Sequence, residues 1–85
     1  MAEVVTVKFF TMLRKATGEQ GYESSARTVA ELLKEVERKH GDGVKRYLDN
    51  CIVLVNGKNI AQLKGKRTRL KDGDEVSLFP PVAGG

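Results

Sequence analysis

The last two residues of the sequence, Gly84 and Gly85, place a free carboxylate on a chain end without side chains. Because glycine has no Cβ, such an end can enter a channel that is too narrow for other residues. Pro80 and Pro81 hold φ at about −65° and favour an extended path, so residues 80–85 span roughly 18–20 Å. In an enzyme site, this carboxylate could attack a nucleotide α-phosphate. We therefore expect acyl activation at Gly85, with a chain end of no function as the alternative.

The other reactive side chains form no pattern typical of a catalytic or metal site. Cys51 is the only cysteine, which excludes an internal disulfide and a four-thiolate site. A persulfide relay is one interpretation of Cys51, but at the start of an apolar run we expect a small core side chain. Asp72 and Asp74 have a spacing that metal ligands use, yet we expect turn residues there. His40 is expected at a helix end. The sequence predicts no bound metal or cofactor.

The composition is typical of one small globular domain. The chain has 85 residues, of which 40% are hydrophobic and 31% charged. No apolar run approaches the roughly 20 residues that a membrane span needs. The start, Met1-Ala2-Glu3, lacks the basic leader of a signal peptide. We therefore expect a cytoplasmic protein without a membrane partner.

The net charge of +4 is concentrated in one loop. Five cations and no acid fall within residues 64–71, namely Lys64, Lys66, Arg67, Arg69 and Lys71. A solvated surface loop is one interpretation, and an acidic protein or an RNA backbone as partner is the other. The loop has few aromatic residues among its cations, which argues against stacking on single-stranded bases, and we do not expect a nucleic acid partner.

The first part of the chain predicts two strands. Residues 4–10 alternate with period two, which indicates a strand with one buried face. Its two faces carry Val5, Val7 and Phe9 on one side, and Thr6, Lys8 and Phe10 on the other. Residues 11–19 are expected to form a connecting loop. Residues 20–25 are expected to return as a short antiparallel strand.

A helix is predicted to begin after Thr28. Thr28 and Glu31 match a capping box, in which each side chain binds a free backbone N–H of the first turn. The apolar residues that follow have helical spacing and form one stripe, Val29, Leu32, Leu33 and Val36. Gly41 is expected to end the helix in a left-handed conformation. A further short helical turn is expected around residues 44–48.

The last part of the chain predicts a buried strand, a turn and a final strand. Residues 52–55 are continuously apolar and are followed by Asn56-Gly57, which is typical of a buried strand followed by a tight turn. Residues 71–74 have the composition of a turn, and residues 75–79 alternate as a last strand. Between them lies a short strand or a loop.

This order of elements predicts an α+β fold. Only one helix is long enough to cover a sheet, so a mixed sheet of four to five strands must pack on it. The first and last strands can lie side by side and parallel, with the intervening chain as the crossover. That arrangement is the ubiquitin-like β-grasp. We expect a β-grasp domain over residues 1–79 and a flexible tail over residues 80–85.

Several segments, in order, resemble the MoaD/ThiS family of ubiquitin-like sulfur carriers. They are Val5-Thr6-Val7-Lys8-Phe9-Phe10, Leu13-Arg14-Lys15-Ala16-Thr17-Gly18, Thr28-Val29-Ala30-Glu31-Leu32-Leu33, Val55-Asn56-Gly57 and Leu70-Lys71-Asp72-Gly73-Asp74-Glu75-Val76. The tail, Phe79-Pro80-Pro81-Val82-Ala83-Gly84-Gly85, resembles that of small subunits of molybdopterin synthase. The resemblance covers nearly the whole chain.

The resemblance implies a carrier that is not catalytic alone. It implies that the Gly85 carboxylate is adenylated with ATP by a ubiquitin-activating-type, MoeB-like enzyme and is then converted to a thiocarboxylate. In the molybdenum-cofactor branch, the tail enters the large, MoaE-like subunit of molybdopterin synthase and gives its sulfur to a pterin precursor. Gly84 and the preceding Pro80, Pro81, Val82 and Ala83 would then lie in the partner's channel.

Phe10 and Phe79 are the residues expected to dock the partner. Alternation places each on the strand face opposite the core, and neighbouring strands would bring the two together. Both match apolar positions through which the family binds its partner; the alternative is a second small core under a loop. Lys58-Asn59 stands where relatives often have an apolar residue, so part of the docking patch is expected to be missing.

Two other functions remain open from the sequence. One is a protein modifier joined through Gly85 to lysines, or a sulfur donor for tRNA thiolation, since the activation chemistry is shared. The other is an interaction module that uses the basic loop and needs no tail.

Overall fold

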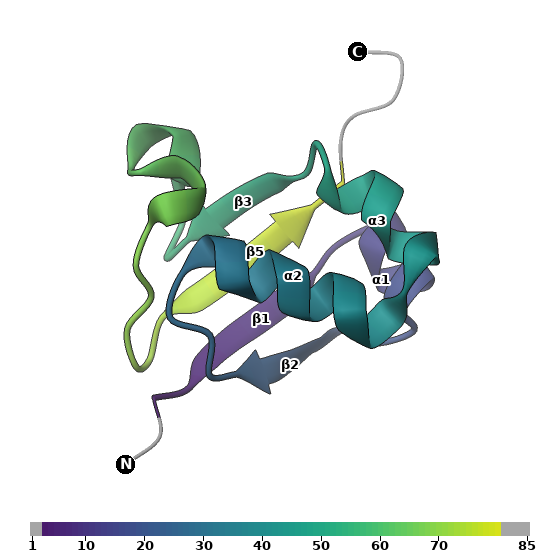
Figure 1. Ribbon diagram of the computed structural model, residues 1–85, viewed down its shortest axis with the longest axis horizontal. Helices are drawn as coiled ribbons and strands as arrows, with labels where there is room; N and C mark the ends of the chain where they lie inside the picture. Colours follow the sequence, from purple (N-terminus) through teal and green to yellow (C-terminus); the bar gives the residue numbers. More distant parts are fainter. Residues whose placement is uncertain (1–2, 81–85) are drawn as a thin grey trace.

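The computed structural model describes residues 3–80, which form one sheet with helices on one of its faces (Figure 1). The elements in chain order are β1 (Val5–Phe9), α1 (Met12–Thr17), β2 (Gly21–Ser24), α2 (Val29–His40), α3 (Asp42–Leu48), β3 (Ile52–Val55), β4 (Lys58–Asn59), the 3-10 turns η1 (Ile60–Gln62) and η2 (Gly65–Arg67), and β5 (Glu75–Phe79). No helix among these residues combines the length and apolar composition needed to cross a bilayer.

The sheet has five strands in the order β2-β1-β5-β3-β4. β1 and β5 are parallel, with Val7 opposite Val76, and the other pairs are antiparallel. The first and last strands therefore lie side by side at the centre, with the rest of the chain as the crossover. This confirms the predicted α+β, ubiquitin-like β-grasp.

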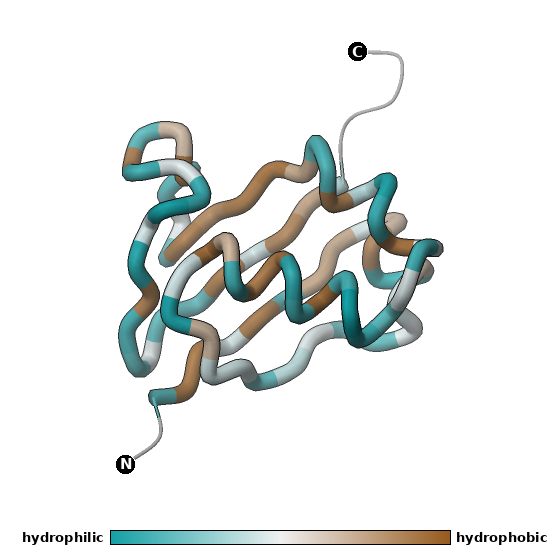
Figure 2. Tube along the Cα trace, viewed as in Figure 1, coloured by the Kyte–Doolittle hydropathy of each residue, from teal (hydrophilic) through white to brown (hydrophobic). Residues whose placement is uncertain are grey.

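The core lies between the sheet and α2. Val5, Val7 and Phe9 have no exposed surface, as the alternation of β1 predicts. The apolar stripe of α2 faces them, and its four predicted residues are all buried. Figure 2 shows the corresponding alternation of brown and teal along α2. Burial of these side chains at about 25 cal/mol per Å² of apolar surface is the main source of stability.

Thr28 caps α2 as predicted, while Glu31 takes a different partner from that of a capping box. The Thr28 hydroxyl accepts a hydrogen bond from the Glu31 N–H at 3.1 Å. The Glu31 carboxylate accepts one from the N–H of Arg27 at 3.0 Å, one residue before the cap. The helix ends at His40, and the Gly41 N–H donates to Glu37 O at 2.7 Å. Gly41 has a positive φ of 77°, as predicted. Its ψ of −161° places it outside the left-handed helical region, so the predicted conformation is wrong.

The loop predicted over residues 11–19 is wrong, because residues 12–17 form the helix α1. Leu13 is fully buried and attaches this helix to the core. The Thr17 hydroxyl donates to Leu13 O at 2.8 Å, and Gly18 ends the helix in the left-handed conformation. This helix of 6 residues buries only one side chain, that of Leu13, so no apolar periodicity marks it in the sequence.

The predicted buried strand is present as β3, but it is buried on one face only. Val53 and Val55 are buried, Leu54 is half-buried and Ile52 is 39% exposed. Asn56 and Gly57 have φ of 52° and 86°, which is typical of the tight hairpin turn predicted there. The second helical turn is confirmed as α3, and the final strand as β5.

The predicted division into a body of residues 1–79 and a tail of residues 80–85 stays a prediction. The described body ends with β5 at Phe79 and the half-buried Pro80. Pro81, Val82, Ala83, Gly84 and Gly85 lie outside the described residues.

Candidate functional site

Phe10 and Phe79 stack on the face of the sheet that the helices leave open. Their ring centroids are 4.4 Å apart and their planes differ by 13°. The Phe10 N–H donates to Leu78 O at 3.1 Å, so the residue continues the pairing of β1 with β5. Both side chains are half-buried. The predicted aromatic pair is therefore present, and no loop within residues 3–80 closes over it completely.

Ile52 extends the aromatic pair across the sheet. It lies opposite Phe79 in the pairing of β3 with β5, and it is 39% exposed. Leu54, two residues along β3, is on the same face. Ile52 was not predicted as a site residue, because a continuous apolar run shows no alternation from which its two faces could be assigned. We use the name apolar patch for Phe10, Ile52, Leu54 and Phe79.

A groove borders the apolar patch on its β2 side. It has a volume of about 450 Å³. Its lining includes Lys8, Phe10, Arg14, Gly21 and Glu23. The Arg14 guanidinium carbon lies 6.0 Å from the centroid of the Phe10 ring. The patch thus has an apolar centre with charged side chains at its margin, the usual composition of a protein docking surface.

The direction of β5 relates this patch to the tail. β1 and β5 are parallel, so their carboxyl ends lie at the same edge, where Phe10 directly follows β1 and Phe79 is the last residue of β5. Pro80 follows Phe79 directly and is half-buried. The chain therefore leaves the described body from the apolar patch itself. The five residues that follow, Pro81 to Gly85, were predicted as site residues and lie outside the described part.

The residues after the β3–β4 turn agree with the expectation of an incomplete patch. Lys58 is exposed and Asn59 half-buried. Asn59 pairs with Leu54, so the position on β4 beside the apolar patch is polar. The apolar patch therefore does not extend onto β4.

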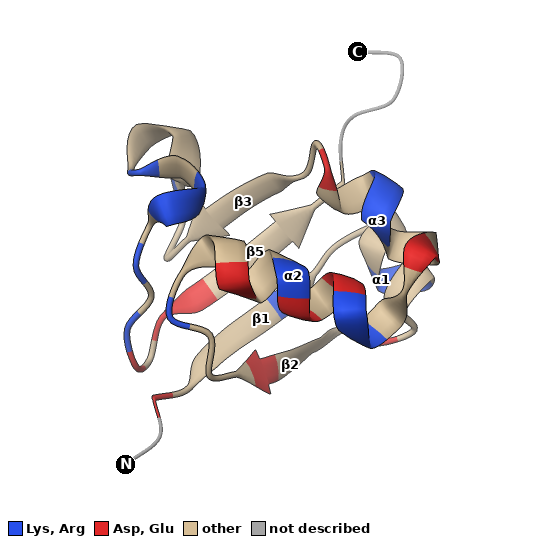
Figure 3. Ribbon diagram, in the orientation of Figure 1, with Lys and Arg blue, Asp and Glu red and all other residues tan. Residues whose placement is uncertain are grey.

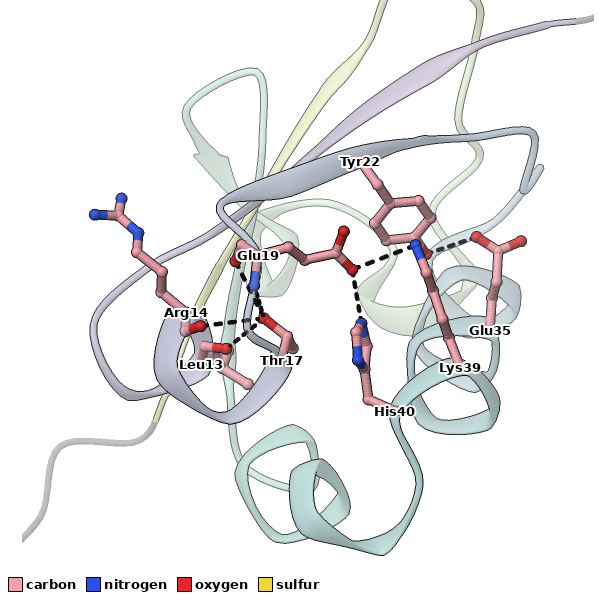
Figure 4. A network of polar contacts seen from close by, with 8 residues as sticks. All are labelled: Leu13, Arg14, Thr17, Glu19, Tyr22, Glu35, Lys39 and His40. Atoms are coloured by element: carbon pink, nitrogen blue, oxygen red, sulfur yellow. Dashed lines mark hydrogen bonds and ion pairs between the residues drawn. The ribbon is translucent and has the colours of Figure 1, made fainter.

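A polar network lies on the helix side of the sheet, away from the apolar patch (Figure 4). One Glu19 carboxylate oxygen lies 2.8 Å from His40 Nε2 and 3.3 Å from Lys39 Nζ. The Lys39 ammonium lies 3.8 Å from the centroid of the Tyr22 ring, and the Tyr22 hydroxyl donates to Glu35 at 2.6 Å. The network joins the α1–β2 connection to the end of α2, which supports a structural role; His40 lies at the helix end as predicted.

Burial, followed by the hydrogen bond to the Glu35 carboxylate, raises the pKa of Tyr22 above its usual range. Both causes favour the neutral phenol. Tyr22 is therefore a hydrogen-bond donor at neutral pH.

Cys51 and the two aspartates take the structural roles predicted for them. Cys51 packs half-buried against the core, and burial raises the pKa of its thiol. Asp72 accepts a hydrogen bond from Val4 N at 2.8 Å, and Asp74 accepts one from Lys71 N at 2.8 Å. Asp72 thus ties the residue before β1 to the turn before β5, and Asp74 binds a backbone N–H within that turn. Within residues 3–80, no three metal-ligating side chains cluster.

The chain is similar to a known family over most of its length. The ThiS family model matches residues 7–85. The small archaeal modifier protein 3 of Haloferax volcanii is 33% identical over 93% of this chain and 96% of its own. The sulfur carrier protein CysO of Mycobacterium tuberculosis is 30% identical over 95% of this chain and 98% of its own.

Solved structures share the fold. The small archaeal modifier protein 1 of Methanosarcina acetivorans has a TM-score of 0.85 and 33% identity, covering 98% of this chain and 97% of its own. A chain of the complex of subunits 1 and 2 of the molybdopterin-converting factor of Helicobacter pylori has a TM-score of 0.69 and 33% identity, covering 96% and 99%.

Proposed function

Because the chain belongs to the ThiS family of sulfur carriers and ubiquitin-like modifiers, we propose that Gly85 is its functional group. The terminal carboxylate is adenylated with ATP by a ubiquitin-activating-type enzyme and is then converted to a thiocarboxylate. The observation that carries this proposal is the position of the apolar patch. A partner bound to Phe10 and Phe79 lies where the chain leaves the body.

The chemistry follows from the tail sequence. A carboxylate oxygen attacks the α-phosphate of ATP, pyrophosphate leaves, and the product is an acyl-adenylate. A sulfur nucleophile then displaces AMP from the acyl carbon. The two glycines offer no side chain that would obstruct these attacks. The protein is a co-substrate in both steps, and its own side chains supply no catalytic group.

We propose the molybdopterin branch as the destination of the sulfur. The similarity to a chain of the molybdopterin-converting factor complex supports it, and so does the Phe-Pro-Pro sequence at residues 79–81. In this branch, a large synthase subunit binds the apolar patch and receives the tail. The thiocarboxylate sulfur is transferred to a pterin precursor in that subunit, and water restores the Gly85 carboxylate.

Intact mass spectrometry tests the proposal. The protein is incubated with the adenylating enzyme of the same genome, ATP and a sulfur donor. We expect a mass increase equal to replacement of one oxygen by sulfur, absent when Gly84 and Gly85 are deleted and retained in the control Lys45→Ala on α3. Adding the large subunit and a pterin precursor should return the mass to its starting value. An unchanged mass with active enzyme contradicts the carrier function.

A second candidate function is a protein modifier, favoured by the similarity to small archaeal modifier proteins. Here a lysine amine, in place of sulfur, attacks the activated Gly85. Immunoblots of native cells should then show a ladder of conjugates that deletion of Gly84 and Gly85 abolishes. A single free band contradicts this function and leaves the sulfur carrier in place.

A further inference from the structure

Six exposed cations gather at the end of the molecule away from the apolar patch (Figure 3). Five belong to the loop after η1, and Arg27 joins them from the segment before α2. The Leu70 N–H donates to Arg27 O at 2.7 Å, and Thr28 forms an isolated bridge with Arg69, so the two segments are adjacent. The basic surface, as we name it, consists of Arg27, Lys64, Lys66, Arg67, Arg69 and Lys71.

The backbone of this surface is held in one conformation. The Lys64 N–H donates to the Thr68 hydroxyl at 3.1 Å, and the Arg67 N–H donates to Lys64 O at 3.1 Å. Thr68 and Leu70 are 8% and 4% exposed, so they attach the loop to the core between the outward cations. A loop ordered in advance loses little conformational entropy when a partner binds.

The cations of this surface take part in no ion pair within the described residues 3–80. The cations of the ion pairs found there are Lys8, Lys39, His40 and Lys45. The carboxylates near the basic surface bind backbone N–H groups instead: Asp74 binds that of Lys71 and Glu31 that of Arg27. The positive side chains are therefore available to an external partner.

A hollow of about 530 Å³ within this surface favours a protein over a nucleic acid as the partner. Its lining combines Arg27, Arg69 and Lys71 with Glu3 and Glu31. A phosphate backbone carries negative charge alone, so phosphates in the hollow would be repelled by the two carboxylates. A protein can place carboxylates against the cations and donors against the acids.

Leu63 gives the same surface an apolar contact point. It is 39% exposed and directly precedes Lys64. An exposed leucine beside cations suits a protein surface, since protein interfaces combine apolar contacts with a polar rim. Phosphate contacts would make no use of it.

We propose that the basic surface is a second docking surface, which binds an acidic surface of the enzyme that adenylates the tail. This inference rests on the proposed function. Every enzyme that receives the tail contacts the apolar patch, from which the tail leaves the body, so the patch alone does not distinguish one enzyme from another. A charged surface away from the patch can make that distinction. Recognition matters most at activation, because a wrongly chosen chain would consume ATP. Complementary charge raises the rate at which the two proteins associate without slowing their dissociation.

Adenylation kinetics with the full-length chain test this surface. Lys66→Glu/Arg67→Glu is compared with Lys34→Glu/Arg38→Glu, a control with the same charge change on exposed positions of α2. We expect the first variant to raise the carrier KM roughly tenfold or more with kcat almost unchanged, and the control to stay within about twofold. The salt dependence of kcat/KM should weaken in the first variant only. Lys66→Gln/Arg67→Gln should give an intermediate KM.

Several outcomes overturn the inference. If both charge reversals raise KM equally, the effect is one of net charge and not of this surface. If wild type is adenylated and Lys66→Glu/Arg67→Glu has an unchanged KM, the second surface fails while the proposed function stands. If wild type is not adenylated by an active enzyme, both fail. Binding of a short RNA duplex at physiological salt that this variant abolishes would replace the protein partner by RNA.

Discussion

The rings of Phe10 and Phe79 stack 4.4 Å apart and join the ends of the first and last strands of the sheet. The pair depends on the parallel alignment of β1 and β5, since parallel strands end at the same edge. The parallel pairing of β1 and β5 thus places the apolar patch and the point where the chain leaves the described body at the same edge of the sheet.

Phe79→Ser should weaken binding of the adenylating enzyme that we propose as a partner. Central aromatic residues of interfaces contribute about 2 kcal/mol or more, so we expect a roughly 30-fold increase in Kd. Calorimetric titration with the adenylating enzyme measures it. Ser77→Ala, two residues earlier on the same face of β5, is the control and should bind like wild type. Equal Kd values for wild type and Phe79→Ser would exclude the apolar patch as the docking surface.

Two glycine substitutions should have opposite effects on stability. In Gly21→Ala, the new Cβ collides with the carbonyl oxygen of Val7 on the neighbouring strand. We expect a loss of about 2 kcal/mol in the free energy of unfolding. Gly43 lies in α3 with nothing within 4 Å of an added Cβ, so Gly43→Ala should gain about 0.5–1 kcal/mol. Urea denaturation compares both with wild type, and a stable Gly21→Ala would contradict the packing of β2 on β1.

Tyr22 should make stability fall at alkaline pH. Its pKa is raised in the folded state above the ordinary value of 10.0, so protons bind more tightly to the folded than to the unfolded chain. The contribution of Tyr22 is complete below pH 10.0 and is lost as the pH rises above it. Tyr22→Phe removes this effect and the hydrogen bond to Glu35, which contributes about 1 kcal/mol.

Unfolding free energies of both proteins between about pH 8 and pH 11 measure the Tyr22 effect. The advantage of wild type over Tyr22→Phe at neutral pH should shrink across this interval. Parallel curves would mean that burial and Glu35 do not affect the ionisation of Tyr22.

Cys51 should react slowly with thiol reagents in the folded protein. Burial raises the pKa of the thiol, and the thiolate is the reactive form. We expect alkylation by iodoacetamide at about pH 8 to be roughly tenfold slower than in the urea-unfolded chain. Mass spectrometry follows the reaction. A faster reaction in the folded protein would support a role for Cys51 in sulfur relay.

Residues whose pattern spans several positions were predicted well. The parity of β1 placed Phe10 on the open face, and the same argument on β5 placed Phe79 beside it. The capping role of Thr28 follows from local chemistry alone. In each case, the residues that determine the structure are close in the sequence or repeat with the period of the element.

Features that depend on tertiary contacts were missed. α1 forms because Leu13 is buried under neighbouring elements, which its own segment does not reveal. Ile52 is exposed because no helix covers that face of the sheet, although its sequence neighbours are all apolar. The basic loop was evident from composition, but its fixed backbone depends on Thr68 and Leu70.

The hydrogen bond from Val4 to Asp72 holds the beginning of β1 beside the turn that precedes β5. An affinity tag fused ahead of Glu3 would consequently start next to the hollow lined by Arg27 and Arg69. A tag after Gly85 would remove the free carboxylate that the proposed function requires. A fusion at either terminus would therefore lie beside one of the two proposed sites, the hollow or the Gly85 carboxylate, so their tests call for untagged protein.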